Sequence, residues 1–373
     1  MNRREFCRQM VIVGGTVMVT PVLAACTRIE AVLTTSVPTA PSVPPAPTST
    51  ITPHPASTTT PNPTSTPQPD QESALAKIAL VKTGDRAAGV RRAIALLGIN
   101  PIRGNRVLLK PNLNSADAAP GSTHPEVLRT LVTELYDLGA QTITLADRSG
   151  MGDTRRVMQQ TGVIDLAQEL GFMTMVLDEL PEKDWVVQQS EDFHWSRGYA
   201  VPKLLLDAEC VVQTCNLKTH RYGGHFTLSL KNSVGLAAKA VNGGSYNYMQ
   251  ELHNSPQQRH MIAEINAAYS PSLIVMDGVE AFVNGGPDRG KKVASEVVLA
   301  GTDRIALDAV GVAILRLLGT TPEVSRGGIF EQEQIARAVE LGLGIDSPDK
   351  IAFITDDIAS QAYAEKIRNT LRM

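Results

Sequence analysis

Residues 209–235, with the sequence ECVVQTCNLKTHRYGGHFTLSLKNSVG, decide how this chain folds. The stretch begins as a short apolar run around Val211, which is typical of a buried parallel strand. A polar run, 216–221, follows it, and residues 226–238 then show the helical spacing of apolar residues. We therefore expect a strand, a polar loop and a helix that bring together four side chains able to do chemistry: Lys218, His220, His225 and Lys231.

Strand and helix patterns alternate through the rest of the region 74–373. Strands are expected at 77–81, 106–110, 141–146, 172–177, 272–276, 295–300 and 350–355. Helices are expected at 86–97, 124–138, 154–160, 164–170, 257–268, 303–318 and 330–341. This alternation predicts an α/β fold with a largely parallel sheet and helices on both faces. Weaker strand patterns predict a small hairpin insertion over 185–203.

The first residues are typical of an export signal. Arg3 and Arg4 form a twin-arginine pair, an apolar stretch follows at 10–25, and small residues precede Cys26 as in bacterial lipoprotein processing sites. Residues 1–26 are therefore predicted to be a twin-arginine signal peptide with a lipobox. Lipidation of Cys26 would anchor the protein to the extracytoplasmic face of the cell membrane, and an uncleaved N-terminal membrane anchor is the alternative.

Residues 27–73 are dominated by Pro, Thr and Ser. Such a composition cannot bury enough apolar area to offset the entropy of ordering the chain, so a disordered linker is predicted. A glycosylated spacer would have the same composition. The folded α/β domain is expected to begin at residue 74.

Charge and cysteine usage exclude some classes of function. The formal net charge is -3, so no basic field indicates a nucleic-acid partner. Two cysteines, Cys210 and Cys215, lie in the folded region. On one extended strand their Cα atoms would be about 16 Å apart, which is too far for a disulfide. We expect two buried free thiols, and an iron–sulfur cluster is not expected because a four-thiolate site needs more cysteines.

Polar residues stand at the ends of several predicted strands, where open α/β sheets bind their ligands. The strands at 106–110 and 141–146 end in Lys110 and Asp147, and the segments at 216–220, 277–278 and 301–303 would close three more. We expect these ends to share one crevice. The residues expected to bind a ligand or cofactor there are Lys110, Asn112, Gly150, Gly152, Asn216 and Asn232.

Several chemistries remain open for this crevice. Lysines suit a small anionic ligand, and the glycines at 150 and 152 would let backbone N–H groups face it. A divalent metal is a second possibility, with Asp147, Asp277 and His253 as the preferred ligands and His220 or His225 as others. A lysine in a dry pocket could also act as a base or nucleophile. The residues expected to be catalytic are Lys218, His220 and Lys231.

A series of short motifs resembles one family in order and spacing. The motifs are Lys110-Pro111-Asn112, Thr123-His124-Pro125-Glu126, Asn216 to His220, Leu230-Lys231-Asn232 with Gly235, His253, Asp277-Gly278, Gly285-Gly286-Pro287 and Thr302-Asp303 with Asp308. Together they resemble the domain of unknown function numbered 362 over nearly the whole folded region. Many of its members are joined to a ferredoxin-type cysteine module, which this sequence lacks. The resemblance implies the fold and the site positions rather than a reaction.

Three functions are compatible with these observations. The first is an exported, lipid-anchored enzyme or cofactor-binding protein. The second is a non-catalytic extracytoplasmic lipoprotein that binds a small molecule. The third is a surface structural module in which the charged residues are incidental. The reaction, the metal and the protein partners are not predicted.

Overall fold

The computed structural model describes residues 75–241 and 244–373. The predicted signal peptide, Cys26 and the 27–73 linker lie outside these ranges. No helix of the described residues combines the length and apolar character needed to cross a bilayer.

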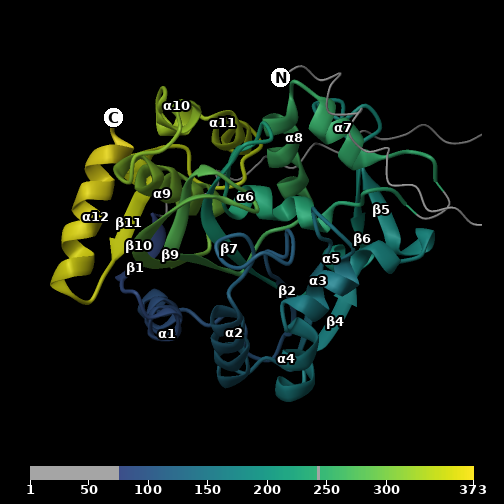
Figure 1. The fold of residues 1–373 in the computed structure, drawn as a ribbon, viewed down its shortest axis with the longest axis horizontal. Coiled ribbons are helices and arrows are strands. Elements are labelled where there is room, and N and C mark those ends of the chain that lie inside the picture. The colour runs from purple at the N-terminus through teal and green to yellow at the C-terminus, as the bar shows by residue number, and fades with distance from the viewer. Residues whose placement is uncertain (1–74, 242–243) are drawn as a thin grey trace, which may run out of the picture. The chain divides into compact units, whose positions relative to one another are not determined.

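A nine-stranded sheet organises the described residues, in the order β11-β1-β10-β9-β7-β2-β3-β4, with β8 paired to β7 (Figure 1). Its strands are β1 (Ala76–Lys82), β2 (Arg106–Lys110), β3 (Thr142–Asp147), β4 (Met173–Val176), β7 (Cys210–His220), β8 (His225–Thr227), β9 (Leu273–Gly285), β10 (Gly290–Gly301) and β11 (Ile351–Ile354). Most neighbours are parallel, but β10 is antiparallel to both β1 and β9, and β8 is antiparallel to β7. The predicted α/β fold is confirmed, with a mixed sheet.

Helices cover both faces of the sheet, as predicted. One face packs against α1 (Arg86–Leu97), α2 (Pro125–Asp137), α3 (Thr154–Gln160) and α4 (Val163–Leu170). The other packs against α9 (Arg304–Leu317), α10 (Pro322–Ser325), α11 (Glu333–Glu340), α12 (Ile358–Leu371), α5 (Lys203–Leu206), α7 (Tyr248–Asn254) and α8 (Gln258–Ile265). Short 3-10 helices lie at Leu177–Glu179, Glu182–Asp184, Ser233–Leu236, Asn266–Ala268, Ile329–Glu331 and Pro348–Lys350.

Alternation along the strands explains this arrangement. In β1, Ile78 and Leu80 join the core beneath α9 and α12, whereas Ala79 and Val81 join the core beneath α1. Because successive side chains of a strand point to opposite faces, a strand that is apolar throughout needs cover on both. The apolar pattern of the strands therefore predicts three layers, in which helices cover both faces of the sheet.

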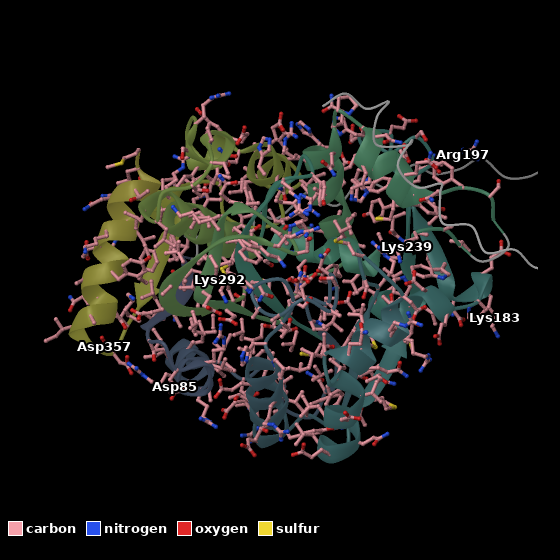
Figure 2. All side chains as sticks on the ribbon, in the orientation of Figure 1. Asp85, Lys183, Arg197, Lys239, Lys292 and Asp357 are labelled. Atoms are coloured by element: carbon pink, nitrogen blue, oxygen red, sulfur yellow. The ribbon has the colours of Figure 1, made fainter. Side chains whose placement is uncertain are left out.

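Capping aspartates mark the starts of two helices. Asp85 and Asp357, at the beginnings of α1 and α12 (Figure 2), accept hydrogen bonds from Ala88 N and Ser360 N, as capping residues do.

The predicted hairpin consists of β5 (Trp185–Gln188) and β6 (Tyr199–Pro202) in antiparallel pairing, so the insertion predicted over 185–203 is confirmed.

Strand β7 is longer than the sequence pattern predicts. It continues to His220, and all eleven of its residues are buried. The polar run 216–220, expected to be a loop, stays extended because β8 pairs with its last three residues on one side and β9 pairs with it on the other. The expectation of a loop here is wrong.

The prediction of a helix over residues 226–238 is also wrong. The segment forms strand β8, then a single turn, α6 (Ser229–Asn232), then the 3-10 helix Ser233–Leu236. Asp308 of α9 holds the start of α6, because its carboxylate accepts hydrogen bonds from Ser229 N at 2.7 Å and Leu230 N at 3.1 Å. Tertiary contacts override the helical spacing.

Strand direction separates one predicted strand end from the others. Because β10 runs antiparallel to β9, the 301–303 segment lies at the edge opposite the carboxyl ends of β2, β3 and β7. Asp303 caps α9 and accepts a hydrogen bond from Ala306 N at 2.8 Å and another from Ile345 N at 2.8 Å. The expectation that this strand end joins the common crevice is wrong.

Candidate functional site

A cavity of about 570 Å³ opens beyond the carboxyl ends of β2 and β3. These strand ends form one wall of the cavity, and the segment that follows β8 forms the opposite wall. The cavity brings together eight of the residues predicted to form the site: Lys110, Asn112, Asp147, Gly150, His220, Lys231, Asn232 and His253. Four other predicted residues do not line it: Gly152, Asn216, Lys218 and Asp277.

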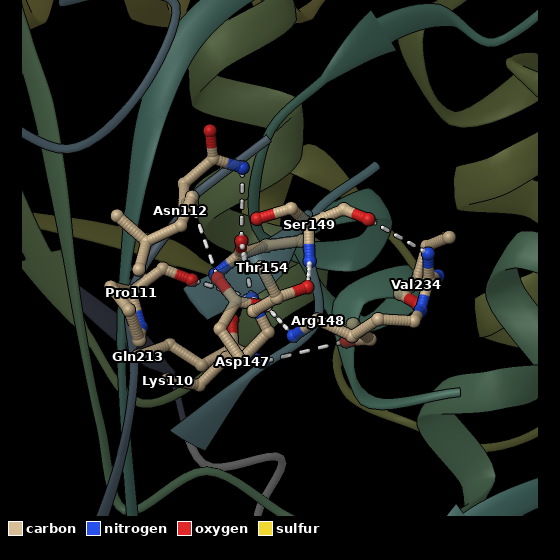
Figure 3. Close-up of polar contacts among 12 residues, drawn as sticks. Lys110, Pro111, Asn112, Asp147, Arg148, Ser149, Thr154, Gln213 and Val234 are labelled. Atoms are coloured by element: carbon tan, nitrogen blue, oxygen red, sulfur yellow. Dashed lines mark hydrogen bonds and ion pairs between the residues drawn. The ribbon is translucent and has the colours of Figure 1, made fainter. Parts of the chain in front are cut away.

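A buried ion pair forms the floor on the sheet side. Lys110 Nζ lies 2.8 Å from Asp147 Oδ1, and both side chains are 1% exposed (Figure 3). Asp147 also accepts hydrogen bonds from Leu113 N at 2.9 Å and Arg148 N at 2.7 Å. Burial lowers the pKa of Lys110 and raises the pKa of Asp147, and the ion pair opposes both shifts.

Lys110 has further partners besides the carboxylate. Its amine donates to Pro111 O at 2.5 Å and to Asn232 Oδ1 at 3.3 Å. Both charges of the pair are thus hydrogen-bonded within the protein, as buried ions must be if they are to be tolerated. This pair is a component of the cavity wall rather than a free group.

Lys218 lies behind this wall. Its amine donates to Asn112 Oδ1 at 2.9 Å and to Gly121 O at 2.5 Å, while Asn112 Nδ2 donates to Asn232 Oδ1 at 3.1 Å. Burial, with help from the nearby charge of Lys231, lowers the pKa of Lys218 to about 7. Lys218 therefore orients Asn112 and does not face the cavity.

Arg148 joins the two walls, and the sequence analysis did not select it. Its buried guanidinium donates to Ala237 O at 2.7 Å and to Val234 O at 2.6 Å, so it fastens the segment after α6 to the end of β3 (Figure 3). Gly235 fits closely here, because a Cβ on it would lie 2.4 Å from Asp147 Oδ1. An arginine directly after a strand-end aspartate is the signal that could have identified it.

Lys231 differs from the other buried lysines of the site. Its side chain lines the cavity and is 8% exposed, and its amine has no hydrogen bond or ion pair with any residue in the described part of the chain. Burial first, and then the charge of Arg148, lower the pKa of Lys231 to about 8. This cation therefore has no counter-ion within residues 75–241 and 244–373.

His220 lies beside Lys231. A Cβ on Gly224 would lie 2.7 Å from Lys231 Cε and 2.9 Å from His220 Nδ1, so the lysine stem and the imidazole pack against the same glycine. Within the described ranges His220 Nδ1 has no hydrogen-bond partner. Burial first, and then the charge of Lys231, hold the pKa of His220 well below its usual value, so the ring is neutral.

His253 also lines the cavity. Its Nδ1 lies 2.7 Å from Met249 O. Because a carbonyl oxygen only accepts, Nδ1 must carry the proton, and in the neutral ring Nε2 is left as an acceptor. Burial lowers the pKa of His253, which favours this neutral form.

The three residues preferred as metal ligands do not form one ligand set. Asp147 and His253 line the cavity, but Asp277 lies outside it, where it pairs with Arg86 Nε at 2.9 Å. Among the residues described, no three His, Cys, Asp or Glu side chains are grouped so that they could hold a metal ion. Cys210 and Cys215 are buried free thiols, as expected.

The remaining predicted residues have structural positions. Gly150 lines the cavity, where a Cβ would lie 2.5 Å from Asn114 Oδ1, and Gly152 adopts a positive φ of 85° just before α3. Asn216 donates to Ser122 O at 3.2 Å. Asn114, which the sequence analysis did not select, lines the cavity, and its buried Nδ2 has no partner among the described residues.

Fold and site together define an α/β protein with a largely cationic cavity at the carboxyl ends of parallel strands. The chain belongs to the family described as the domain of unknown function DUF362, which matches residues 107–313, more than half of the sequence. The family resemblance seen in the motifs is thereby confirmed.

Individual proteins similar to this chain include a curated relative and a solved structure. The thylakoid-associated protein sll1697 of Synechocystis sp. (strain ATCC 27184 / PCC 6803 / Kazusa) is 27% identical over 248 residues, which cover 63% of this chain and 72% of that protein. The lactate racemase apoprotein of Thermoanaerobacterium thermosaccharolyticum has a TM-score of 0.39 and 14% identity. That match covers 63% of this chain and 55% of the other, so it spans little more than half of that protein.

Proposed function

We propose that this protein binds a small anionic molecule in the cavity, with Lys231 as the principal cation. One observation carries the proposal: a buried ammonium group faces the cavity with no counter-ion among the described residues. An unpaired buried charge is costly, so a ligand that brings a negative charge would remove that cost. The gain in electrostatic energy would be larger in this buried site than at the protein surface.

The charges around Lys231 support the same conclusion. Of the residues that the structure describes, five charged ones line the cavity: four are cationic (Lys110, Arg148, Lys231 and Lys239) and one, Asp147, is acidic. Asp147 is paired with Lys110, and Lys239 is paired with Asp178 outside the cavity at 3.5 Å. The two histidines are neutral, so Lys231 and Arg148 supply the net positive charge. A net positive cavity of this size favours a small anion over a divalent cation.

We place this function on the outside of the cell membrane. The support is the sequence of residues 1–26, which has the twin-arginine pair and the small residues before Cys26. The ligand would then be an extracytoplasmic metabolite. Incorporation of a labelled fatty acid that is abolished by Cys26→Ala is the expected result, and labelling that persists in this variant would contradict lipidation at Cys26.

Calorimetric titration of the purified protein with inorganic phosphate, pyruvate and citrate tests the binding proposal. Lys231→Met should weaken the binding of whichever anion is bound by at least about tenfold, which corresponds to about 1.4 kcal/mol. The matched control is Lys292→Met, because Lys292 is an exposed lysine that pairs with Glu280 and does not line the cavity. Unchanged affinity in Lys231→Met, or equal losses in both variants, would refute the proposal.

A further inference from the structure

We infer that Lys231 is a nucleophilic amine that forms an imine with the carbonyl carbon of a small oxo acid bound in the cavity. This inference rests on the proposed anion-binding function and names the chemical class of the anion. An oxo acid carries both groups that the site can engage, since its carboxylate meets the positive cavity and its carbonyl meets the amine.

Hydrogen bonding distinguishes Lys231 from the two other buried lysines nearby. The amine of Lys110 has Asp147, Pro111 O and Asn232 as partners, and the amine of Lys218 has Asn112 and Gly121 O. Lys231 lacks any such partner in the described part of the chain, so its nitrogen lone pair becomes available as soon as the proton leaves. A desolvated lysine next to another cation is the environment that activates amines for attack on carbonyl groups.

The groups around Lys231 suit the proton transfers of imine formation. His220 packs against the same glycine as the lysine stem, is neutral, and has an unpartnered Nδ1. His253 also lines the cavity and has Nε2 as an acceptor. Either imidazole can take the proton of the ammonium group or return one to the carbonyl oxygen.

The reaction balances without any other reactant. The neutral amine attacks the carbonyl carbon, a C–N bond forms, and the carbonyl oxygen takes a proton to give a carbinolamine. The carbinolamine then loses its hydroxyl group and the remaining hydrogen on nitrogen as one water molecule, and a C=N bond is left. Both hydrogens of that water are balanced by the two hydrogens of the neutral amine. No electrons are gained or lost overall, and protonation of the imine nitrogen restores the positive charge that faces the carboxylate.

A buried amide donor gives the carboxylate a second contact. Asn114 lines the cavity, and its buried Nδ2 has no partner in the ranges that the structure describes. An unsatisfied buried donor costs free energy, which a carboxylate oxygen would recover. Asn114 and the iminium nitrogen would therefore hold the two ends of one small molecule.

Reductive trapping tests the inference on the purified protein. Pyruvate or glyoxylate is added with sodium cyanoborohydride, which reduces an imine to a stable secondary amine, and the modified residue is located by peptide mass spectrometry. We expect about one adduct per chain, at Lys231, in wild type and in the control Lys292→Arg. Saturating inorganic phosphate should slow the labelling because it competes for the cavity.

The variant Lys231→Arg separates this inference from anion binding. Arginine keeps the positive charge but cannot form the imine, so pyruvate should still bind by calorimetry while the adduct falls at least tenfold. If wild type binds pyruvate and Lys231 is labelled no faster than surface lysines, the imine is refuted and the anion site stands. If wild type binds no anion and gives no adduct, both proposals fail.

Discussion

The two walls of the cavity use the same residue types in opposite ways. On the sheet side, Lys110 and Asp147 satisfy each other, and backbone groups complete their hydrogen bonds. On the other side, Lys231 is also buried, but its amine has no partner among the described residues, and neither has Nδ1 of the neighbouring His220 at the end of β7. Burial alone therefore does not distinguish Lys231 from Lys110, whereas the absence of partners among the described residues does.

This difference assigns separate roles to the two walls. A saturated ion pair stabilises the fold only while both partners are present, so either single substitution should be costly. An unsaturated cation costs stability in the absence of a ligand, so its removal should cost little.

Breaking the sheet-side pair should have the largest effect. Lys110→Met leaves the buried carboxylate of Asp147 without its cation, and the free energy of unfolding should fall by about 3–5 kcal/mol, as measured by urea denaturation. The double variant Lys110→Met/Asp147→Leu removes both charges and should recover part of this loss. A loss below about 1 kcal/mol in the single variant would show that the pair is not needed.

Gly235→Ala should have a smaller effect of the same kind. The added Cβ would lie 2.4 Å from Asp147 Oδ1 and 2.8 Å from Lys110 Nζ, so the pair must shift. We expect a loss of about 1–3 kcal/mol in urea denaturation. The matched control is Gly84→Ala, because a Cβ at Gly84 meets nothing within 4 Å, and an equal loss in both variants would contradict the close fit at Gly235.

Lys231→Met should lower the free energy of unfolding least: near pH 7 we expect a loss below about 1 kcal/mol or a gain, because no described partner is lost and a costly unpaired charge is removed. The way in which the free energy of unfolding depends on pH is a more informative comparison of this variant with wild type. The folded-state pKa of Lys231 is lowered from 10.5 to about 8, so the unfolded chain binds more protons between these values and wild-type stability should rise with pH across this window. Lys218 contributes in the same direction from about pH 7 and is still present in Lys231→Met. The free energy of unfolding, measured by urea denaturation, should therefore rise less steeply with pH in the variant than in wild type. An equal slope in both would contradict the lowered pKa of Lys231.

Much of the fold could be predicted from the sequence because apolar periodicity is a local property. The alternation of strands and helices and the hairpin at β5 and β6 follow from it. Strand direction does not, and the antiparallel course of β10 places Asp303 at the other edge of the sheet. The polar end of β7 remained a strand because β8 and β9 pair with it, which no local pattern contains.

The site was predictable in its location but not in its roles. Strand-end positions predicted that Lys110, Asp147 and His220 would share one crevice, and all three line the cavity. The sequence could not separate Lys218 from Lys231, because that distinction depends on Asn112 and Gly121 O as partners from a distant loop. Asp277 was placed at the site for its strand-end position, but Arg86 from α1 pairs with it elsewhere.

Direct titration of the Lys231 amine by NMR tests the central claim most directly. The protein is labelled with ¹³C and ¹⁵N at lysine, and the side-chain signal missing from Lys231→Arg gives the assignment. We predict that this amine titrates near pH 8 in the free protein and at a higher pH when inorganic phosphate or pyruvate is added, because a bound anion stabilises the ammonium form. A pKa near the ordinary lysine value of about 10.4 that neither anion changes would contradict the account.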